Sequence, residues 1–249
     1  MPTVHQIYEE MTRIAPLELA ESWDNPGLLV DCGGQVERVL VALDITPEVV
    51  DEAAEKGCRL IVSHHPVIFS PLKKISEEDV PFRLVQKKIS AVCMHTNLDA
   101  ADGGVNDRLA HALGLSALSP LNEEKIGRIG TLSCEIPLEE FLPAVVKSLG
   151  CNGLRYRDGG RPVHRVAVGG GACRDYIPQA IAQGCDTFVT ADLRYNDFLD
   201  THGLNLIDAG HFPTENVVCG AVCAHLEKAF PSLEVVCSAS HRDAIQYYI

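Results

Sequence analysis

The chain is short of positively charged residues. Its 249 residues include 21 Lys and Arg against 34 Asp and Glu, which gives a formal net charge of −13 at pH 7. Non-specific binding to nucleic acid requires a basic surface that neutralises phosphates. The composition therefore argues against nucleic acid as a partner, although bound divalent ions would still create a local cationic site.

Long apolar runs are also missing. No run approaches the roughly 18 residues that a membrane-spanning helix requires, although apolar residues make up 46% of the chain. Residues 1–15 carry Glu9, Glu10 and Arg13 among apolar side chains, a pattern typical of an amphipathic helix and not of a signal peptide. We expect a cytoplasmic protein without a membrane partner.

The ten cysteines include no Cys-x-x-Cys pair. Cys58 and Cys185 each lie just before an apolar run, and Cys219 and Cys223 are one helical turn apart. Small apolar thiols in such positions are typical of the core of a cytosolic protein. We predict reduced, buried cysteines and no disulfide framework.

Two common catalytic signatures are absent or incomplete. The sequence has no Gly-x-Ser-x-Gly, which argues against a serine hydrolase. Gly169-Gly170-Gly171 follows an apolar run and invites a phosphate,. It lacks the Lys-Ser/Thr of a P-loop and the spacing of a dinucleotide fingerprint, so we interpret it as a tight turn.

Apolar runs alternate with helical patterns along the chain, which favours an α/β protein with buried sheets. Thr46 is a good N-cap, Pro47 suits the first helical position, and Gly57 ends the helix,. We expect strands near residues 28–30, 39–43, 60–63, 91–94, 131–136 and 233–238, and helices near 3–14, 47–56, 81–88, 105–113, 138–149 and 215–229.

An internal repeat relates the two halves. Residues 38–42 (RVLVA) align with residues 165–169 (RVAVG), and without a gap Gly57-Cys58 falls on Gly184-Cys185. Any two βαβ units share some likeness, but several matched positions in order favour a duplication. In the same alignment His64-His65 falls on Ala191-Asp192, and a shorter offset then places His95 on His211 and Asp99 on Glu215.

Metal-binding side chains follow four of the apolar runs. His64-His65-Pro66 follows one run, His95 and Asp192 follow two others, and His211 follows the fourth. Adjacent residues of a strand point to opposite sides, so His64 and His65 could reach two different ions. An isolated His-His pair is more often one imidazole that caps a loop beside one exposed imidazole.

Two His-x-x-x-carboxylate segments favour metal binding by His64 and His65 over that structural interpretation. His95 precedes Asp99 and His211 precedes Glu215 by the same spacing, which in a tight loop lets both side chains face one point. Each carboxylate alone could be a helix cap or a surface residue. Together with His64 and His65 they supply three to four imidazoles and two carboxylates, a donor set that suits a pair of divalent ions.

The sequence at this point resembles the Nif-three-like family, whose members are often called GTP cyclohydrolase I type 2 homologues. The resemblance covers essentially the whole chain. Its motifs are residues 23–28 (WDNPGL), 41–44 (VALD), 63–66 (SHHP) and 95–99 (HTNLD), and Gly210-His211 with Thr214-Glu215.

This resemblance implies two related, interleaved α/β domains with a duplicated core, a dinuclear metal site in the cleft between them, and a ring-shaped homohexamer. We predict a first domain of residues 1–125 plus 216–249 and a second of residues 126–215. The final helix and strand after Glu215 are expected to pack back on the N-terminal half.

Carried over residue by residue, the resemblance implies that His64, His65, Asp99, His211 and Glu215 are the metal ligands. His95 is a candidate proton shuttle beside them, and its repeat equivalence to His211 leaves ligation open. Relatives often have a His after the Asp-x-x-Tyr of the second repeat, whereas this chain has Asn196 after Tyr195.

We predict a dinuclear metal-dependent hydrolase that acts on a nucleotide or a related phosphorylated, anionic small molecule, as the GTP cyclohydrolase I type 2 name suggests. The alternative is a non-enzymatic metal-binding scaffold or regulatory protein. A mixed His and carboxylate site suits zinc, iron, manganese or cobalt, and the sequence does not choose among these metals or name the substrate.

Overall fold

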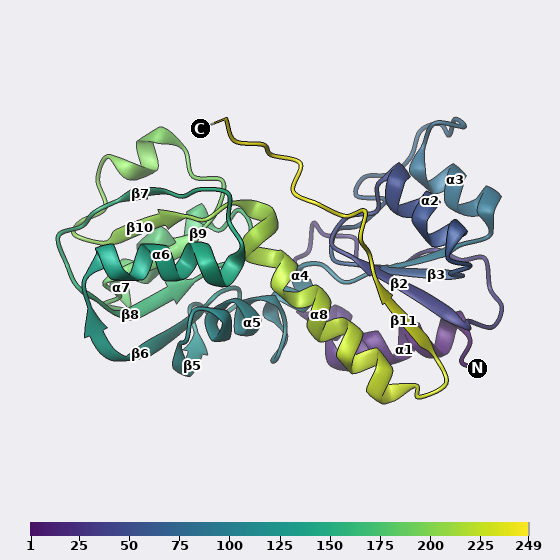
Figure 1. Ribbon diagram of the computed structural model, residues 1–249, viewed down its shortest axis with the longest axis horizontal. Coiled ribbons are helices and arrows are strands. Elements are labelled where there is room, and N and C mark those ends of the chain that lie inside the picture. Colours follow the sequence, from purple (N-terminus) through teal and green to yellow (C-terminus); the bar gives the residue numbers. More distant parts are fainter. Residues whose placement is uncertain (249) are drawn as a thin grey trace. The chain divides into compact units, whose positions relative to one another are not determined.

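The computed structural model describes residues 1–248 and shows a mixed α/β protein with two sheets (Figure 1). The chain divides into two compact units. The first unit comprises Met1–Asp102 and Cys219–Arg242, and the second comprises Gly103–Val218 and the residues from Asp243 on. The domain boundaries expected from the sequence, 1–125 plus 216–249 and 126–215, stay a prediction.

The first unit is built on a sheet with the strand order β1-β4-β3-β2-β11. Its centre consists of the parallel strands β2 (Arg38–Ala42), β3 (Leu60–Ser63) and β4 (Ser90–Cys93). The edge strand β1 (Gly27–Val30) pairs antiparallel with β4, and β11 (Glu234–Cys237) pairs parallel with β2. The expected return of the C-terminal strand to the N-terminal half is therefore confirmed.

Helices cover both faces of this sheet. Figure 1 shows α2 (Pro47–Glu55) and α3 (Val80–Lys87) on one face and α1 (Val4–Ile14) on the other. The Thr46 hydroxyl accepts a hydrogen bond from the backbone N–H of Val49, as its N-cap position predicts,. The core under α2 and α3 includes Leu40, Ile61 and Ala91 from the three central strands. Strands β3 and β4 are buried throughout, as their continuous apolar runs predict,.

The second unit is built on a sheet with the strand order β5-β6-β8-β9-β10-β7. The parallel strands are β8 (Val163–Val168), β9 (Thr187–Thr190) and β10 (Asn205–Asp208). The antiparallel strands are β5 (Ser116–Pro120), β6 (Arg128–Ile136) and β7 (Arg155–Arg157).

The two faces of this second sheet are covered by different helices. Helices α5 (Val105–Ala112) and α6 (Leu138–Leu149) pack against Val166, Val168 and Ile207. On the other face, η2 (Arg174–Tyr176), α7 (Ile177–Ala182) and η3 (Tyr195–Phe198) pack against Ala167, Phe188 and Leu206. Successive residues of β8 thus enter opposite cores, as the alternation of side chains along a strand requires.

Strand register confirms the internal repeat. In the first unit Val39 pairs with Leu60, and in the second unit the aligned residue Val166 pairs with Thr187. Both repeat helices end before a glycine of positive φ, Gly57 at +69° and Gly184 at +71°,. The two units therefore share the same strand, helix and strand in the same register.

Some elements differ from the sequence-based prediction. The residues of the edge strands β5 and β7 are exposed or half-buried. These strands therefore contain no continuous apolar run from which they could have been predicted. Helix α8 (His211–Ala229) begins at His211 and not near Glu215. Pro213 lies in its first turn, where a missing backbone N–H costs no helical hydrogen bond.

The buried position of most cysteines agrees with the prediction. Cys58 and Cys185 are each 2% exposed, and Cys219 is buried, while Cys223 is half-buried. Burial raises the pKa of the Cys58 and Cys185 thiols to about 11,. Over residues 1–248, no helix combines the length and the apolar character needed to cross a membrane.

A buried carboxylate ties α2 to the segment that follows β11. Glu52 accepts hydrogen bonds from the backbone N–H groups of Ala239 and Ser240 at 2.9 and 3.0 Å, and Lys56 Nζ lies 2.6 Å away. Burial alone would raise the pKa of Glu52, but these hydrogen bonds and that of Ser238 hold it well below its usual range,.

Glu52→Gln should lower the free energy of unfolding at neutral pH by about 1–3 kcal/mol, because a charged acceptor is lost. The folded pKa is depressed, so the stabilisation is present above the unfolded pKa of about 4.3. It is lost as the pH falls toward the folded pKa. Urea unfolding at several pH values should show the difference from wild type shrinking in acid. Glu55→Gln, an exposed change on the same helix, is the control, and an equal loss in both variants would contradict the assignment.

Candidate metal centre

The chain bends sharply where β3 ends and turns two imidazoles toward one another. The backbone N–H groups of His64 and His65 both donate to the carbonyl oxygen of Leu43, at 3.2 and 2.9 Å. The strand ends at Ser63, so the alternation of side chains no longer applies and the expectation that His64 and His65 point to opposite sides is wrong. Their ring centroids lie 5.0 Å apart.

His95 joins the same group from the end of the neighbouring strand β4. Its ring centroid lies 5.2 Å from that of His64 and 5.6 Å from that of His65. One ring nitrogen from each of the three residues lies within 4.8 Å of the others. The carboxyl ends of parallel strands meet at one edge of a sheet, which is where binding sites of α/β proteins form. This imidazole cluster can hold a metal ion.

Each imidazole of the cluster is oriented by an oxygen atom at Nδ1. A metal-bound histidine commonly donates its second N–H to a carboxylate or carbonyl, which fixes the tautomer and the ring orientation. With Nδ1 as the donor, Nε2 carries the lone pair that a metal requires. The Nδ1 distances are 2.9 Å from His64 to Met94 O, 2.7 Å from His65 to Asp44 Oδ1 and 2.7 Å from His95 to Asp24 Oδ1.

Asp24 is the most constrained of these acceptors. Its side chain has no exposed surface, and besides His95 it accepts hydrogen bonds from the backbone N–H and the hydroxyl of Thr96 at 3.0 and 2.5 Å. Burial raises the pKa of Asp24, but the hydrogen bonds from His95 and Thr96 outweigh it and bring the pKa to about 2,. Asp24 is therefore ionised at neutral pH and holds His95 with Nδ1 protonated.

Asp99 lies beside the cluster on a short helix. Helix α4 (Thr96–Ala100) has His95 as its N-cap, and Asp99 is 8% exposed. Asp99 Oδ1 is 3.8 Å from Nε2 of His64. The sequence predicted a tight loop for this segment, and the structure corrects it: the spacing of His95 and Asp99 works because the intervening residues are helical.

The second unit brings His211 and Glu215 together in the same way. Both lie in the first turn of α8, with His211 Nε2 3.1 Å from Glu215 Oε2 and Glu215 4% exposed. Here too the predicted tight loop is a helix. His211 Nδ1 lies 2.7 Å from a carboxylate oxygen of Asp192, whose backbone adopts φ of +54° two residues after the end of β9.

Hydrogen bonds and charge favour a bound cation at His211. Burial lowers its pKa, but the carboxylates of Glu215 and Asp192 raise it, with a net value of about 9,. A proton on Nε2 and a divalent ion at Nε2 would both face the carboxylate of Glu215, so the two compete for one position,. Asp192 supports His211 here as Asp44 supports His65 in the first unit.

The triple glycine is a tight turn against Glu215. Gly170 N–H donates to Asn106 Oδ1 at 2.9 Å, and Gly171 N–H donates to the Thr214 hydroxyl at 3.0 Å. These donors are engaged within the protein, so the turn is not a phosphate cradle. A Cβ added at Gly171 would overlap Oε1 of Glu215, so glycine here keeps room for that carboxylate.

These residues fit a divalent ion by the chemistry of their donors. Four imidazoles present Nε2 with Nδ1 anchored, and buried carboxylates accompany them in both units,. Sequence reasoning gave no orienting role to Asp24, Asp44 or Asp192. Asp24 directly follows a turn, and Asp44 and Asp192 each lie two residues after the end of a strand. All three are near a histidine only in space, which sequence spacing does not reveal.

Three of the other histidines have separate partners. His225 Nε2 lies 2.6 Å from Glu10 Oε1, and His241 Nδ1 accepts from the backbone N–H of Leu43 at 3.0 Å. His5 lies 3.1 Å from Asp31 at the surface. Within residues 1–248, none of these joins a group of metal-binding side chains.

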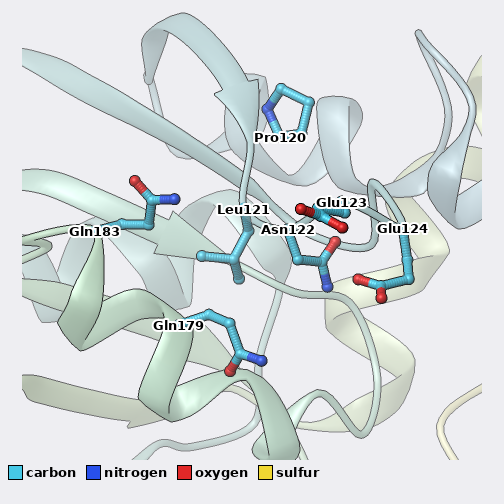
Figure 2. A pocket seen from close by; sticks show the side chains of 7 residues that line it. All are labelled: Pro120, Leu121, Asn122, Glu123, Glu124, Gln179 and Gln183. Atoms are coloured by element: carbon cyan, nitrogen blue, oxygen red, sulfur yellow. The ribbon is translucent and has the colours of Figure 1, made fainter.

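A hollow of about 520 Å³ in the second unit contains none of the predicted site residues. Figure 2 shows the carboxylates of Glu123 and Glu124 in it, together with the amides of Gln179 and Gln183 from the region of α7. Two carboxylates disfavour an anionic ligand. The residues that line the hollow are Pro120, Leu121, Asn122, Glu123, Glu124, Gln179 and Gln183.

Asp44→Ala should weaken the affinity of the purified protein for zinc about 10- to 100-fold, because His65 loses the acceptor that fixes its Nδ1–H. Competition with a chromophoric chelator measures this affinity, and circular dichroism checks the fold. Asp31→Ala is the matched control, since Asp31 also pairs with a histidine and its side chain is 43% exposed against 45% for Asp44. Equal affinities in the two variants would rule out the orienting role.

Comparisons with known proteins agree with these features. A family model described as Duf34/NIF3 (NGG1p interacting factor 3) matches residues 2–244. A GTP cyclohydrolase 1 type 2 homolog from Clostridium acetobutylicum is 35% identical over 216 residues, which cover 81% of this chain and 81% of that protein. A protein of the same name from Clostridium perfringens is 33% identical over 249 residues, with 94% of this chain and 95% of that protein covered.

A solved structure extends the likeness to three dimensions. The crystal structure of a Bacillus cereus protein related to NIF3 matches with a TM-score of 0.90 at 26% identity and covers 99% of both chains. The resemblance expected from the sequence motifs is thereby confirmed. On the family model, the sequence identities and this fold, the chain belongs to the Duf34/NIF3 family.

Proposed function

We propose that this protein is a metal-dependent hydrolase that acts on a nucleotide or a related phosphorylated small molecule. One observation carries the proposal: the imidazoles of His64, His65 and His95 converge, and each is anchored through Nδ1 so that Nε2 is the atom available to a metal. Metal-bound histidines commonly have such an acceptor at the second ring nitrogen, and here all three neighbouring imidazoles have one,.

His64, His65, Asp99, His211 and Glu215 are the proposed ligands of two divalent ions. Their chemistry admits zinc, iron, manganese or cobalt. Ions bound in this way lower the pKa of a water molecule and polarise the bond that it attacks. Three neutral imidazoles and two carboxylates leave two divalent ions with a net positive charge, which would attract an anionic substrate to an otherwise acidic protein.

His95 and Asp24 are the proposed proton-transfer pair. The ionised Asp24 keeps the proton of His95 on Nδ1, so Nε2 remains basic. That nitrogen would accept a proton from the attacking water and return it to the leaving group. If Nε2 of His95 is instead a metal ligand, another group must deprotonate the water. The two roles can be told apart, because loss of a ligand lowers the metal content and loss of a proton acceptor does not.

A second candidate function is a metal-binding scaffold or regulatory protein without turnover. Asn196 favours it, because the family resemblance implies a histidine at this position and the exposed amide of Asn196 does not exchange a proton near neutral pH,. We also propose a ring-shaped homohexamer for either function. Light scattering over a range of concentrations tests this assembly, and a monomer throughout would contradict it.

His65→Ala and Glu215→Ala should each lower the metal content of protein purified without a chelating resin from about two ions per chain, because each removes a ligand. Elemental analysis measures the content, and His111→Ala on α5 is the control. Unchanged content in both ligand variants would rule out the site.

His95→Ala should lower the rate of hydrolysis more than it lowers metal content, by about 100-fold or more if His95 is the general base. The measurement is turnover of a panel of nucleotides and phosphoesters by protein loaded with each candidate metal. If the loaded wild-type protein turns over none of them and His95→Ala changes only metal content, the scaffold replaces the hydrolase.

A further inference from the structure

Two large aromatic side chains lie exposed and side by side in the first unit. Trp23 is 58% exposed and Phe69 is 52% exposed, and their ring centroids are 6.0 Å apart at an interplanar angle of 54°. Burial of such rings would stabilise the fold, so neighbouring aromatic rings left in water often mark a binding surface.

These rings continue into the imidazole cluster. The His95 ring lies 6.2 Å from Trp23 at 78° and 6.4 Å from Phe69 at 82°, so both contacts are edge-to-face. On its other side His95 contacts His64 and His65. The exposed fraction rises along this series, from 2% at His64 to more than half at the two aromatic residues. One end of the series is therefore the imidazole cluster that can hold a metal ion, and the other end meets solvent.

The loops that carry the two aromatic residues are tied to each other. Asn25 Nδ2 donates to the carbonyl oxygen of Ile68 at 2.6 Å, which joins the segment after Trp23 to the segment before Phe69. Asp24 is held by Thr96. The positions of both rings are thus set on folding, which lowers the entropy cost of binding a ligand between them.

We propose that Trp23 and Phe69 form a stacking subsite for the planar heteroaromatic ring of the substrate, a purine ring in the case of a nucleotide. Because the two rings are tilted at 54° to one another, a third ring can stack on the face of one and contact the edge of the other. Offset-stacked and edge-to-face contacts are the arrangements that aromatic rings prefer. A ring bound there has its substituents beside His95, at the entrance to the imidazole cluster. The substrate class rests on the proposed function, but the subsite binds a ring whether or not hydrolysis occurs.

The fluorescence of Trp23 tests the proposal directly, because Trp23 is the only tryptophan of the chain. Chelator-treated protein is titrated with guanosine, adenosine and ribose 5-phosphate, and absorption by the ligands is corrected. Both nucleosides should quench the emission in a saturable way, and ribose 5-phosphate should not. The same result is expected after zinc is added back.

Variants locate the bound ring. Phe69→Leu should weaken nucleoside binding about tenfold, since it replaces one stacking surface by an aliphatic side chain. Tyr156→Leu, a change of a 53% exposed aromatic residue on β7, should leave the affinity unchanged. Equilibrium dialysis allows Trp23→Leu to be compared with Trp23→Phe, and the phenylalanine variant should retain most of the affinity. Circular dichroism confirms that each variant folds.

Several results would overturn the subsite. These are the absence of saturable quenching with and without zinc, or equal affinities in the Phe69→Leu and Tyr156→Leu variants. A lower association state in Trp23→Leu or Phe69→Leu without any nucleoside binding would make the patch a subunit contact. Nucleoside binding without turnover would contradict the proposed hydrolase function but support the stacking subsite. Failure of one proposal can therefore be distinguished from failure of the other.

Discussion

The candidate site depends on hydrogen bonds that are made away from the metal position. An imidazole on a single Cβ can rotate and can carry its proton on either nitrogen, so a histidine in the right place is not yet a ligand. The oxygen atoms of Met94, Asp44 and Asp24 remove both freedoms for the three histidines of the first unit. Asp192 does the same for His211 in the second.

Those oxygen atoms are in place because of the strand register. Asp44 follows β2, the two adjacent histidines follow β3, and Met94 and His95 follow β4. Parallel pairing fixes which residues lie side by side where neighbouring strands end. Ser63 at the end of β3, for example, pairs with Cys93 at the end of β4. A slip of one residue between β2 and β3 would move Asp44 away from His65, and a slip between β3 and β4 would move Met94 away from His64,. The register of the strands therefore also determines the geometry of the candidate metal site.

Elements with continuous apolar runs or clear caps could be predicted from the sequence. The central strands, α2 with its Thr46 cap and the repeat all belong to this class, because burial on both faces demands apolar residues without interruption. The identities of His64, His65, Asp99, His211 and Glu215 as candidates also came from the sequence. That they are ligands stays a prediction until metal is measured.

The remaining features depend on contacts between distant residues. The helical course of the segments after His95 and His211 was not predicted. Helix α4 has only five residues, and its N-cap His95 makes no capping hydrogen bond through its side chain. In α8 the expected start near Glu215 lies four residues after the observed start at His211. The repeat alignment also hid a small difference: β4 ends two residues before His95 and β10 ends three residues before His211. Gly210, at φ of +85°, takes up the additional residue in a conformation that other residues rarely adopt,.

The position of β11 has a consequence for the order in which the molecule forms on the ribosome. The sheet of the first unit ends with β2 until residues 234–237 have left the ribosome, and by then all of 103–218 has left it as well. During that interval β2 presents an open strand edge, the kind of surface that pairs with other nascent chains. The sheet of the first unit is therefore completed only after the residues of the second unit up to 218 have been synthesised.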